Sequence, residues 1–329
     1  MGELPDADGQ PLTLHVGVAI RERRIDKYLH GRFRNLSRRF IQNAIKAGTV
    51  KVNGEPVKCS FKLTHRDVID FVVPEPPKKD IEPEDIPLDI MYEDDDLIVL
   101  NKPADLIIHP ARGNRHGTLV NALAHYSDQL STGLGEFRPG IVHRLDRNTT
   151  GVMVVTKHDT AQWKIAKQFE LRQVRKSYLA IVHGTPELTA DRISAPLGVH
   201  PKIREKYAVR PEQGKEAVTF YEVAETFRGF SLVHCKPRTG RTHQIRVHLA
   251  YIKHPIVADD MYGGKLVYPW QLADAEPAAE SPVIGRCALH AWRLEFTHPS
   301  TEERVQFEAP LPEDMQTFLD MLAEHRPAK

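Results

Sequence analysis

The feature that most constrains the fold of this chain is a segment rich in proline and glutamate, PEPPKKDIEPEDIP, at residues 74–87. Proline at this density interrupts both helices and sheet ladders, so the segment predicts a connector between two separately folded parts. A length of 329 residues also suits two domains. We therefore expect a tail over residues 1–12, a small domain over 13–74, a linker over 75–87 and a larger domain over 88–325.

The small domain has the pattern of a helix followed by a hairpin. Ser37 is a suitable helix cap, the apolar residues from Phe40 to Ile45 recur at helical spacing, and Gly48 is a suitable end to the helix. Val50 and Val52 then alternate with polar residues, and Asn53-Gly54 predicts a tight turn. This pattern indicates a small α+β unit.

Charge is distributed unevenly between these parts. Residues 13–73 contain 13 Lys/Arg against 5 Asp/Glu, whereas residues 74–100 contain 2 against 10. A basic module beside an acidic connector indicates a polyanionic partner for the module, although basic residues on a helix are often only a solvated face. The candidate phosphate-binding residues are Arg32, Arg34, Arg38, Arg39, Lys46 and Lys51.

The larger domain mixes buried strands and amphipathic helices without regular alternation. This order favours an α+β fold over a doubly wound parallel sheet. The strands are expected at 97–100, 152–155, 178–182 and 230–233, and the helices at 160–170 and 242–251.

Several classes of protein do not fit the composition. No apolar run approaches the roughly 18 residues of a membrane helix, and the N-terminus lacks the pattern of a secretory signal. Cys59, Cys235 and Cys287 are isolated, which favours a reducing compartment, with the cytoplasm as the expected location. The sequence shows no zinc-binding spacing, no Walker loop and no GxGxxG loop, so we expect neither a metal nor a nucleotide cofactor.

One aspartate is a candidate for chemistry. Asp146 lies in IVHRLDRNTTGVMVVTK, residues 141–157, between Arg144 and Arg147 and just before an apolar strand. The flanking arginines are expected to keep its carboxyl ionised. Such a carboxylate is suited to act as a nucleophile or an electrostatic stabiliser, and it is equally suited to a surface salt bridge.

Two further segments allow a functional and a structural interpretation. Tyr178 lies within an apolar strand, either as part of the core or with its ring at a site. In RTGRTHQIRVH, residues 238–248, Thr242 is a possible helix cap and Arg246 follows one turn later. This helix start is either an anion-binding site or an exposed basic helix.

Together the motifs carry a family resemblance. HRLDRNTTG, residues 143–151, resembles the HRLDxxTSG signature of the RluA-type pseudouridine synthases, with Thr150 in place of the usual serine. LNKPADLIIHP, KSYLA, GRTHQIRVH and LHA follow or precede it in the family's order. The basic module, from RIDKYL through VKVNGEPV, is similar to an S4 RNA-binding domain. This domain order is that of the RluC/RluD group of large-subunit rRNA synthases, and the chain most resembles the RluD branch.

The resemblance implies an α+β fold, with a mixed, mainly antiparallel central sheet in the catalytic domain and a small α+β S4 domain before it. It implies isomerisation of uridine to pseudouridine in RNA without cofactor or metal, by a protein expected to be a monomer. Large-subunit rRNA, free or in an assembling subunit, is the expected partner. The alternatives are a tRNA uridine, another base-releasing enzyme, or a non-catalytic RNA-binding or ribosome-assembly protein. The modified position stays open.

The resemblance also assigns roles to residues. Asp146 matches the family's essential aspartate, Tyr178 its active-site tyrosine and Arg246 the arginine that pairs with the aspartate. Whether the aspartate attacks the ribose or promotes a glycal intermediate stays open. Contacts with RNA are expected from Arg144, which would fill the gap left by a flipped uridine, from Leu289 in the base pocket, and from His143 and Arg241.

Overall fold

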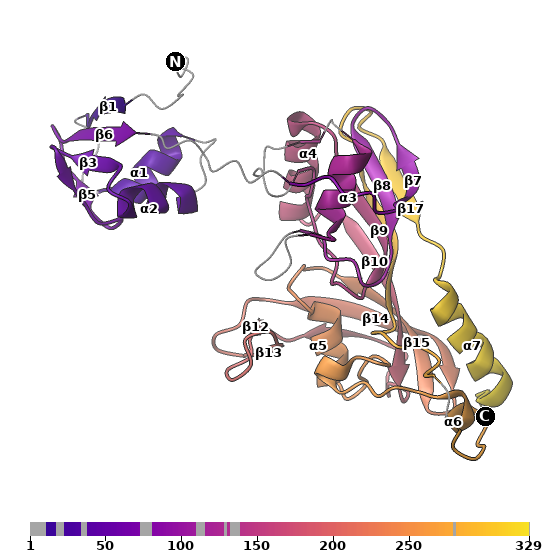
Figure 1. Cartoon of the computed structure of the whole chain (residues 1–329). Helices are drawn as coiled ribbons and strands as arrows, with labels where there is room; N and C mark the ends of the chain where they lie inside the picture. Colours follow the sequence, from indigo (N-terminus) through magenta and orange to yellow (C-terminus); the bar gives the residue numbers. More distant parts are fainter. Residues whose placement is uncertain are drawn as a thin grey trace. The chain divides into compact units, whose positions relative to one another are not determined.

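The chain forms two units, divided between Asp80 and Ile81, in a computed structural model (Figure 1). The division falls within the connector expected from the sequence. The structure describes residues 11–17, 23–33, 38–72, 81–109, 116–127, 130–131, 139–278 and 281–328. Ser37 and the other residues between these ranges lie outside the described part.

The N-terminal unit combines two helices with small antiparallel sheets. A four-stranded sheet has the order β1-β6-β3-β4, and β2 pairs with β5. Asn53 and Gly54 both have positive φ in the turn between β3 and β4, as an Asn-Gly hairpin turn requires. The elements are β1 (Pro11–His15), β2 (Arg23–Arg24), α1 (Ile25–Arg32), α2 (Arg38–Lys46), β3 (Val50–Val52), β4 (Glu55–Pro56), β5 (Lys62–Leu63) and β6 (Val68–Val72).

A buried aspartate connects the two helices of this unit. The side chain of Asp26 in α1 is fully buried and accepts hydrogen bonds from Arg24, from Arg38 at 2.8 Å and from Gln42 at 2.8 Å. Burial alone would raise the pKa of Asp26, but the hydrogen bonds from Arg24, Arg38 and Gln42 hold it well below its usual range. Arg38 and Gln42 lie in α2, so this carboxylate fixes α2 against α1.

The C-terminal unit is built on one large mixed sheet. Its order is β11-β14-β15-β10-β16-β9-β8-β7, with β17 paired to β16. The β16–β9 pairing is parallel, and the other strand pairs of this sheet are antiparallel. The strands are β7 (Asp89–Glu93), β8 (Leu97–Lys102), β9 (Thr150–Thr156), β10 (Arg175–His183), β11 (Ala190–Ser194), β14 (Val218–Phe227), β15 (Phe230–Pro237), β16 (Leu289–Thr297) and β17 (Arg304–Glu308).

Helices and a separate hairpin surround this sheet. They are α3 (Leu119–Tyr126), α4 (Asp159–Glu170), α5 (Gln244–Tyr251), α6 (Pro269–Leu272), α7 (Glu313–His325) and the 3-10 turn η1 (Asp260–Tyr262). The hairpin pairs β12 (Leu197–Val199) with β13 (Tyr207–Val209). These elements confirm the expected α+β fold and its mainly antiparallel central sheet. Within the described residues, no helix is long and apolar enough to cross a membrane.

Separate apolar clusters lie on the two halves of the sheet. One contains Val233 of β15 and Leu249 of α5, and another contains Leu100 of β8 and Met153 of β9. Tyr178 of β10 packs against both clusters. The sheet therefore holds this tyrosine where its two halves meet.

We expect Asp26→Asn to destabilise the N-terminal unit by about 2 kcal/mol, because two arginines lose their charged acceptor. The depressed pKa of Asp26 gives stability that is present above the pKa of an unfolded aspartate, about 4, and is lost as the pH falls below it. Hydrogen exchange of the α1 and α2 amides in the full chain, corrected for intrinsic rates, measures both effects. Asp70→Asn is the control, since Asp70 accepts a hydrogen bond from the Thr13 hydroxyl at the sheet edge. Equal protection in the two variants would contradict the assignment.

Candidate active site

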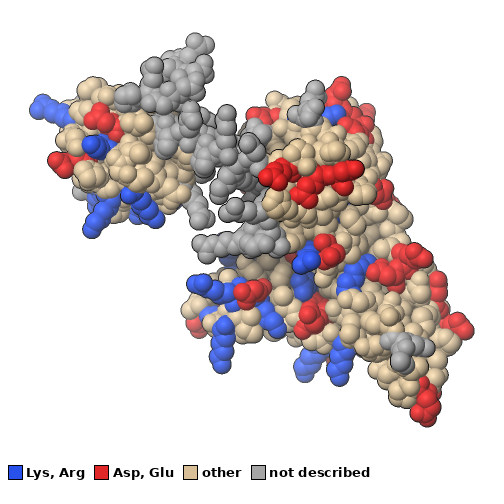
Figure 2. Space-filling view, in the orientation of Figure 1, with Lys and Arg blue, Asp and Glu red and all other residues tan. Residues whose placement is uncertain are grey.

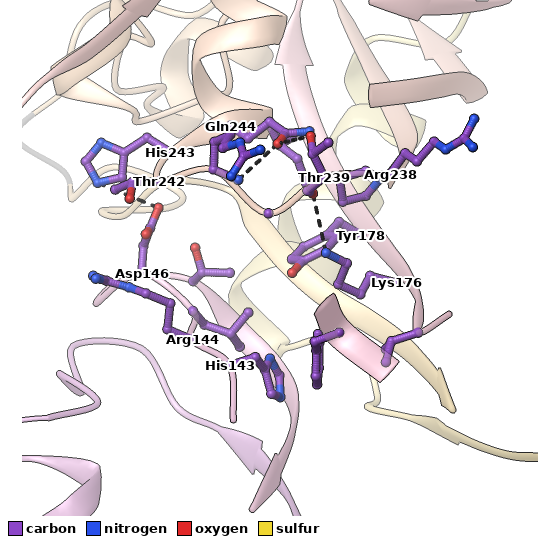
Figure 3. A pocket seen from close by; sticks show the side chains of 18 of the residues that line it. His143, Arg144, Asp146, Lys176, Tyr178, Arg238, Thr239, Thr242, His243 and Gln244 are labelled. Atoms are coloured by element: carbon purple, nitrogen blue, oxygen red, sulfur yellow. Dashed lines mark hydrogen bonds and ion pairs between the residues drawn. The ribbon is translucent and has the colours of Figure 1, made fainter. Parts of the chain in front are cut away.

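A cavity of about 460 Å³ lies where the Asp146 loop, β10 and the segment before α5 come together. Figure 3 shows Asp146, Arg144 and His143 from the loop, Tyr178 and Lys176 from β10, Thr239 and His243 from the segment before α5, and Gln244 at the start of α5. Along the chain, Lys176 follows Asp146 by 30 residues, and Thr239 follows Tyr178 by 61 residues. The tertiary fold therefore brings together the motifs singled out in the sequence.

The neighbours of the Asp146 carboxylate come from α5 and the residue before it. Its Oδ2 atom lies 3.4 Å from Nη1 of Arg246 and 3.8 Å from Nε2 of His243. The sequence interpretation, in which Arg144 and Arg147 flank the carboxylate and hold its charge, was wrong for Arg147. Arg147 instead pairs with Asp105 at 2.7 Å and does not line the cavity.

Arg246 is itself fixed by a buried carboxylate. Its Nε and Nη2 atoms both donate to Asp259 at 2.7 Å, and its guanidinium lies over the ring of Tyr262, 5.0 Å from the ring centre. Burial alone would lower the pKa of Arg246, but the hydrogen bonds to Asp259 raise it above the ordinary value. The third nitrogen, Nη1, is thereby left facing Asp146.

The segment before α5 differs from the sequence prediction. The helix begins at Gln244, and the residue before it is His243, so Thr242 is not its cap. The side-chain oxygen of Gln244 accepts hydrogen bonds from Thr239 and from the backbone of Arg241, and its amide donates to Val218 in β14. Gln244 thus ties the segment to the sheet, which the sequence analysis did not foresee.

His243 has a backbone conformation that is uncommon for histidine, with φ of 56°. Its Nδ1 lies 2.8 Å from the Tyr262 hydroxyl, which accepts a hydrogen bond from the backbone of Tyr207. Nε2 faces the Asp146 carboxylate at 3.8 Å, so a proton on Nε2, with Nδ1 accepting from the Tyr262 hydroxyl, is the neutral form that suits both neighbours. Burial lowers the pKa of His243, which favours this neutral form.

A buried lysine fixes the backbone of the Asp146 loop. Lys102 is fully buried, and its Nζ donates to the carbonyls of Pro103, Leu106 and Arg147 at 2.7–3.0 Å. Burial lowers the pKa of Lys102 to about 7. The sequence analysis gave this lysine no role. Its position in the LNKPADLIIHP motif was the one sequence feature that could have pointed to it.

The end of the signature motif joins the LHA motif across the β9–β16 pairing. The Thr150 hydroxyl lies 2.8 Å from Nδ1 of His290, and Gly151 is bridged to Ala291. A Cβ atom on Gly151 would lie 2.2 Å from the Ala291 carbonyl oxygen, and φ at this glycine is 114°. Only glycine fits here, which explains the Thr-Thr-Gly ending of the motif.

Tyr178 and Lys176 lie on the same side of β10 and line the cavity. Burial raises the pKa of Tyr178, and the nearby Asp146 adds to this, so its hydroxyl keeps its proton. Burial lowers the pKa of Lys176 to about 8, and its Nζ lies 3.3 Å from the Thr239 carbonyl oxygen. The sequence analysis did not single out Lys176.

The other predicted residues also line the cavity. Leu289 is buried and Arg144 is exposed, as an apolar base pocket and a residue open to RNA would require. The Nε of Arg241 donates to the Glu216 carbonyl at 3.0 Å. His143 accepts a hydrogen bond from the Val154 amide and stacks on Phe169, while burial lowers its pKa to about 3. His143 therefore also supports the wall of the cavity as a neutral ring.

The six basic residues predicted to bind phosphate belong to the N-terminal unit, which the structure describes separately. Arg32, Lys46 and Lys51 are exposed, and Arg38 binds Asp26. Arg34 lies outside the described residues, as does the side chain of Arg39. Figure 2 shows lysine and arginine side chains on the surface of this unit.

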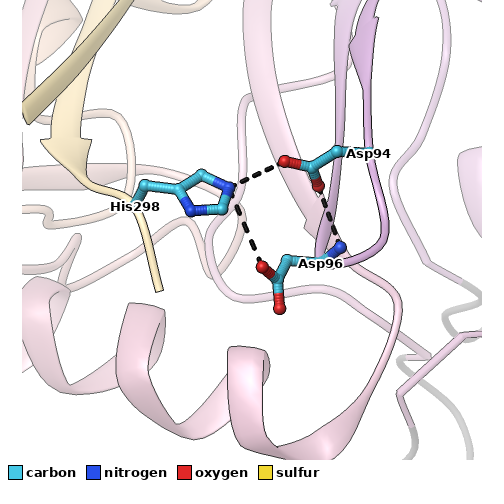
Figure 4. Close-up of side chains that lie close together, drawn as sticks. All are labelled: Asp94, Asp96 and His298. Atoms are coloured by element: carbon cyan, nitrogen blue, oxygen red, sulfur yellow. Dashed lines mark hydrogen bonds and ion pairs between the residues drawn. The ribbon is translucent and has the colours of Figure 1, made fainter. Parts of the chain in front are cut away.

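A group of possible metal ligands lies elsewhere, at Asp94, Asp96 and His298 (Figure 4). Nδ1 of His298 accepts from the amides of Ser300 and Thr301, so its Nε2 carries the proton and donates to Asp94 at 2.8 Å. Asp94 also accepts from two backbone amides and from a tyrosine hydroxyl. These contacts form a complete hydrogen-bond network, and the protonated Nε2 does not suit a metal ligand.

The cavity combines the positioned Asp146 carboxylate, the protonated phenol of Tyr178 and six Lys/Arg side chains with a partly apolar wall. Such a set can hold a planar base, stabilise charge that develops at a sugar carbon, and transfer a proton.

Comparison with known proteins identifies the same chemistry. Residues 96–251 match the family model described as RNA pseudouridylate synthase, and residues 23–69 match the S4 domain model. Human RNA Pseudouridylate Synthase Domain Containing 4 has a similar structure, with 28% sequence identity and a TM-score of 0.55. The match covers 71% of this chain and 93% of that one.

Curated relatives match over nearly the whole chain. Ribosomal large subunit pseudouridine synthase D of Xanthomonas campestris is 41% identical, over 98% of this chain and 97% of the relative. The uncharacterized RNA pseudouridine synthase YlyB of Bacillus subtilis is 42% identical, over 93% and 96%. The chain therefore belongs to the RluA-type RNA pseudouridine synthases, isomerases that here carry an N-terminal S4 RNA-binding domain.

Proposed function

We propose that the enzyme isomerises specific uridines of large-subunit ribosomal RNA, with Asp146, Tyr178 and Arg246 as its catalytic residues. The observation that carries the assignment of residues is the cavity in which Arg246 faces Asp146 and Tyr178 lines the wall. The choice of RNA is supported by relatives named for the large ribosomal subunit, which are 39–42% identical to this chain. The S4 domain also supports an RNA substrate.

Each residue has one task in this proposal. The bond between N1 and C1′ breaks, and the Asp146 carboxylate stabilises or captures the sugar carbon as it does so. The detached uracil turns on the Tyr178 ring, C5 bonds to C1′, and the proton of C5 is lost while N1 gains one. Arg246 orients the carboxylate. The net change conserves every atom, so neither redox chemistry nor a co-substrate is needed.

Extrusion of the target base is assigned to the mouth of the cavity. Arg144 is exposed there and is proposed to occupy the space that the uridine leaves, while buried Leu289 contacts the extruded base. Unstacking a base costs on the order of a few kcal/mol and costs least in a loop, so loop uridines are the proposed targets. His143 and Arg241 are proposed to shape the same surface.

The S4 domain supplies affinity in this proposal. Exposed Arg32, Lys46 and Lys51, together with Arg34, Arg38 and Arg39, are proposed to bind phosphates. The cysteines among the described residues are free, which suits the reducing cytoplasm.

Asp146→Asn is expected to reduce turnover at least about 1,000-fold, because the amide cannot stabilise the sugar carbon as the carboxylate does. RNA affinity should stay within about twofold of wild type, since the side chain keeps its size. Asp105→Asn, which alters an exposed aspartate outside the cavity, is the control and should keep full turnover. Mass spectrometry of the RNA after reaction tests the reaction type: an unchanged RNA mass indicates isomerisation, and loss of uracil would indicate a glycosylase instead.

Lys176 predicts a dependence of RNA affinity on pH. Its pKa of about 8 means that the ammonium is present below pH 8 and is lost as the pH rises through this value. The Kd for RNA, measured with the inactive Asp146→Asn protein, should therefore rise about three- to tenfold between pH 7 and pH 9. Lys176→Arg keeps its charge and should remove this dependence. The same weakening in Lys176→Arg would exclude Lys176 as its source.

The substrate is tested by mapping pseudouridines in total RNA from cells with and without the gene. Loss of one or a few sites in large-subunit rRNA, restored by wild type and not by Asp146→Asn, is the expected result. Loss confined to tRNA would replace the proposed substrate and leave the reaction intact. An unchanged map, in cells shown to express the protein, would favour a non-catalytic role in ribosome assembly.

A further inference from the structure

A second cavity of about 370 Å³ adjoins the one that contains Asp146. Both cavities are lined by Arg172, Val174, Lys176, Pro237 and Arg238, so they are continuous at the surface. The second cavity, here called the β10–β15 groove, is lined in addition by residues of β16 and β17.

The sheet topology explains why a groove occurs here. β10 pairs with β15 from Tyr178 to His183, but the preceding residues, Arg175 to Ser177, pair with β16 instead. The two strands therefore diverge beyond Tyr178. Lys236 and Pro237 at the end of β15 form the opposite wall of the groove.

The groove has a strong excess of positive charge. A single acidic residue, Glu295, lies among its lining residues. Surface ion pairs engage four of the six cations. The pairs are Arg172–Glu216 at 2.9 Å, Arg175–Glu295 at 3.2 Å, Lys236–Glu222 at 3.7 Å and Arg293–Glu308 at 2.6 Å. Pairs this exposed contribute little energy, so the cations remain available to a competing anion. The basic lining residues are Arg172, Arg175, Lys176, Lys236, Arg238 and Arg293.

Two buried nitrogen atoms in this lining have no hydrogen-bond partner among the described residues. They are Nε2 of His234 and Nε of Arg293. Both side chains also contact Trp292, the histidine at its edge and the guanidinium over its ring at 4.3 Å. A buried polar atom without a hydrogen-bond partner is costly, so a native site that holds two of them is suited to a ligand with acceptor oxygens.

We propose that the β10–β15 groove binds the ribose–phosphate backbone of the RNA nucleotides next to the one that enters the Asp146 cavity. Phosphate oxygens match the cations, and phosphate or ribose oxygens can accept from Arg293 and His234. The strand is single-stranded at this point, because the target uridine is extruded from a loop. This inference rests on the proposed function and adds to it the path of the strand that flanks the target.

Lys236 and Arg228, near opposite ends of β15, allow a matched test because each forms an ion pair with an acidic residue. Lys236 lies in the groove, whereas Arg228 lies just before the other end of the strand and pairs with Asp274 at 2.9 Å. We expect Lys236→Gln to raise KM for deproteinised large-subunit rRNA about three- to tenfold, with kcat at saturating RNA unchanged. The slope of log KM against log salt concentration should fall by about 1, because one phosphate contact is lost. Arg228→Gln should leave both quantities unchanged.

Arg175→Gln is the second variant, since 78% of this side chain is exposed and its replacement leaves the core intact. It should reproduce the changes in KM and salt slope. Wild-type slopes in both groove variants, or equal changes in Arg228→Gln, would overturn the proposal. These outcomes are read in an active enzyme. Failure of the proposed function would appear differently, as wild-type protein that forms no pseudouridine in this rRNA.

Discussion

The buried fork between Arg246 and Asp259 is the interaction on which the rest of the active site depends. Both hydrogen bonds are 2.7 Å long and lie away from water, so the guanidinium has a single orientation. That orientation aims its remaining nitrogen at Asp146, 3.4 Å away. The Asp146 carboxylate is partly buried, and an unpaired buried charge is costly, so the nearby guanidinium offsets its burial. Asp259 therefore orients the partner of Asp146 without lining the cavity.

Many residues of the sequence motifs form contacts that hold helices, strands and loops together. Lys102 holds the Asp146 loop by three carbonyls, and Gln244 attaches the segment before α5 to β14. Gly151 permits the close approach of β9 and β16, which a Cβ atom would prevent. Most of these residues position the backbone that carries the few reactive side chains. Preorganisation of this kind holds the few charged side chains of a site in fixed positions before a substrate binds.

Much of the fold could be predicted from the sequence, where local signals are strong. The apolar strands around 97–100 and 152–155 and the turn at Asn53-Gly54 follow from periodicity and turn chemistry. The sequence analysis misplaced the start of α5 because Thr242 satisfies the local rule for a helix cap. The helix instead begins at Gln244, whose side chain forms hydrogen bonds with β14, and β14 is distant in sequence. The interpretation of Arg147 failed for a similar reason, since adjacency in sequence does not decide which partner a side chain finds.

The sequence by itself determined the division into two units, the α+β class and the family, because proline, periodicity and ordered motifs are all local properties of a chain. The tertiary structure alone decided which charges meet. It placed Asp259, 13 residues beyond Arg246 along the chain, within hydrogen-bond distance of the guanidinium. It also formed a basic groove where β10 diverges from β15. Contacts of this kind depend on the register and divergence of strands distant in sequence, and no pattern within one segment encodes them.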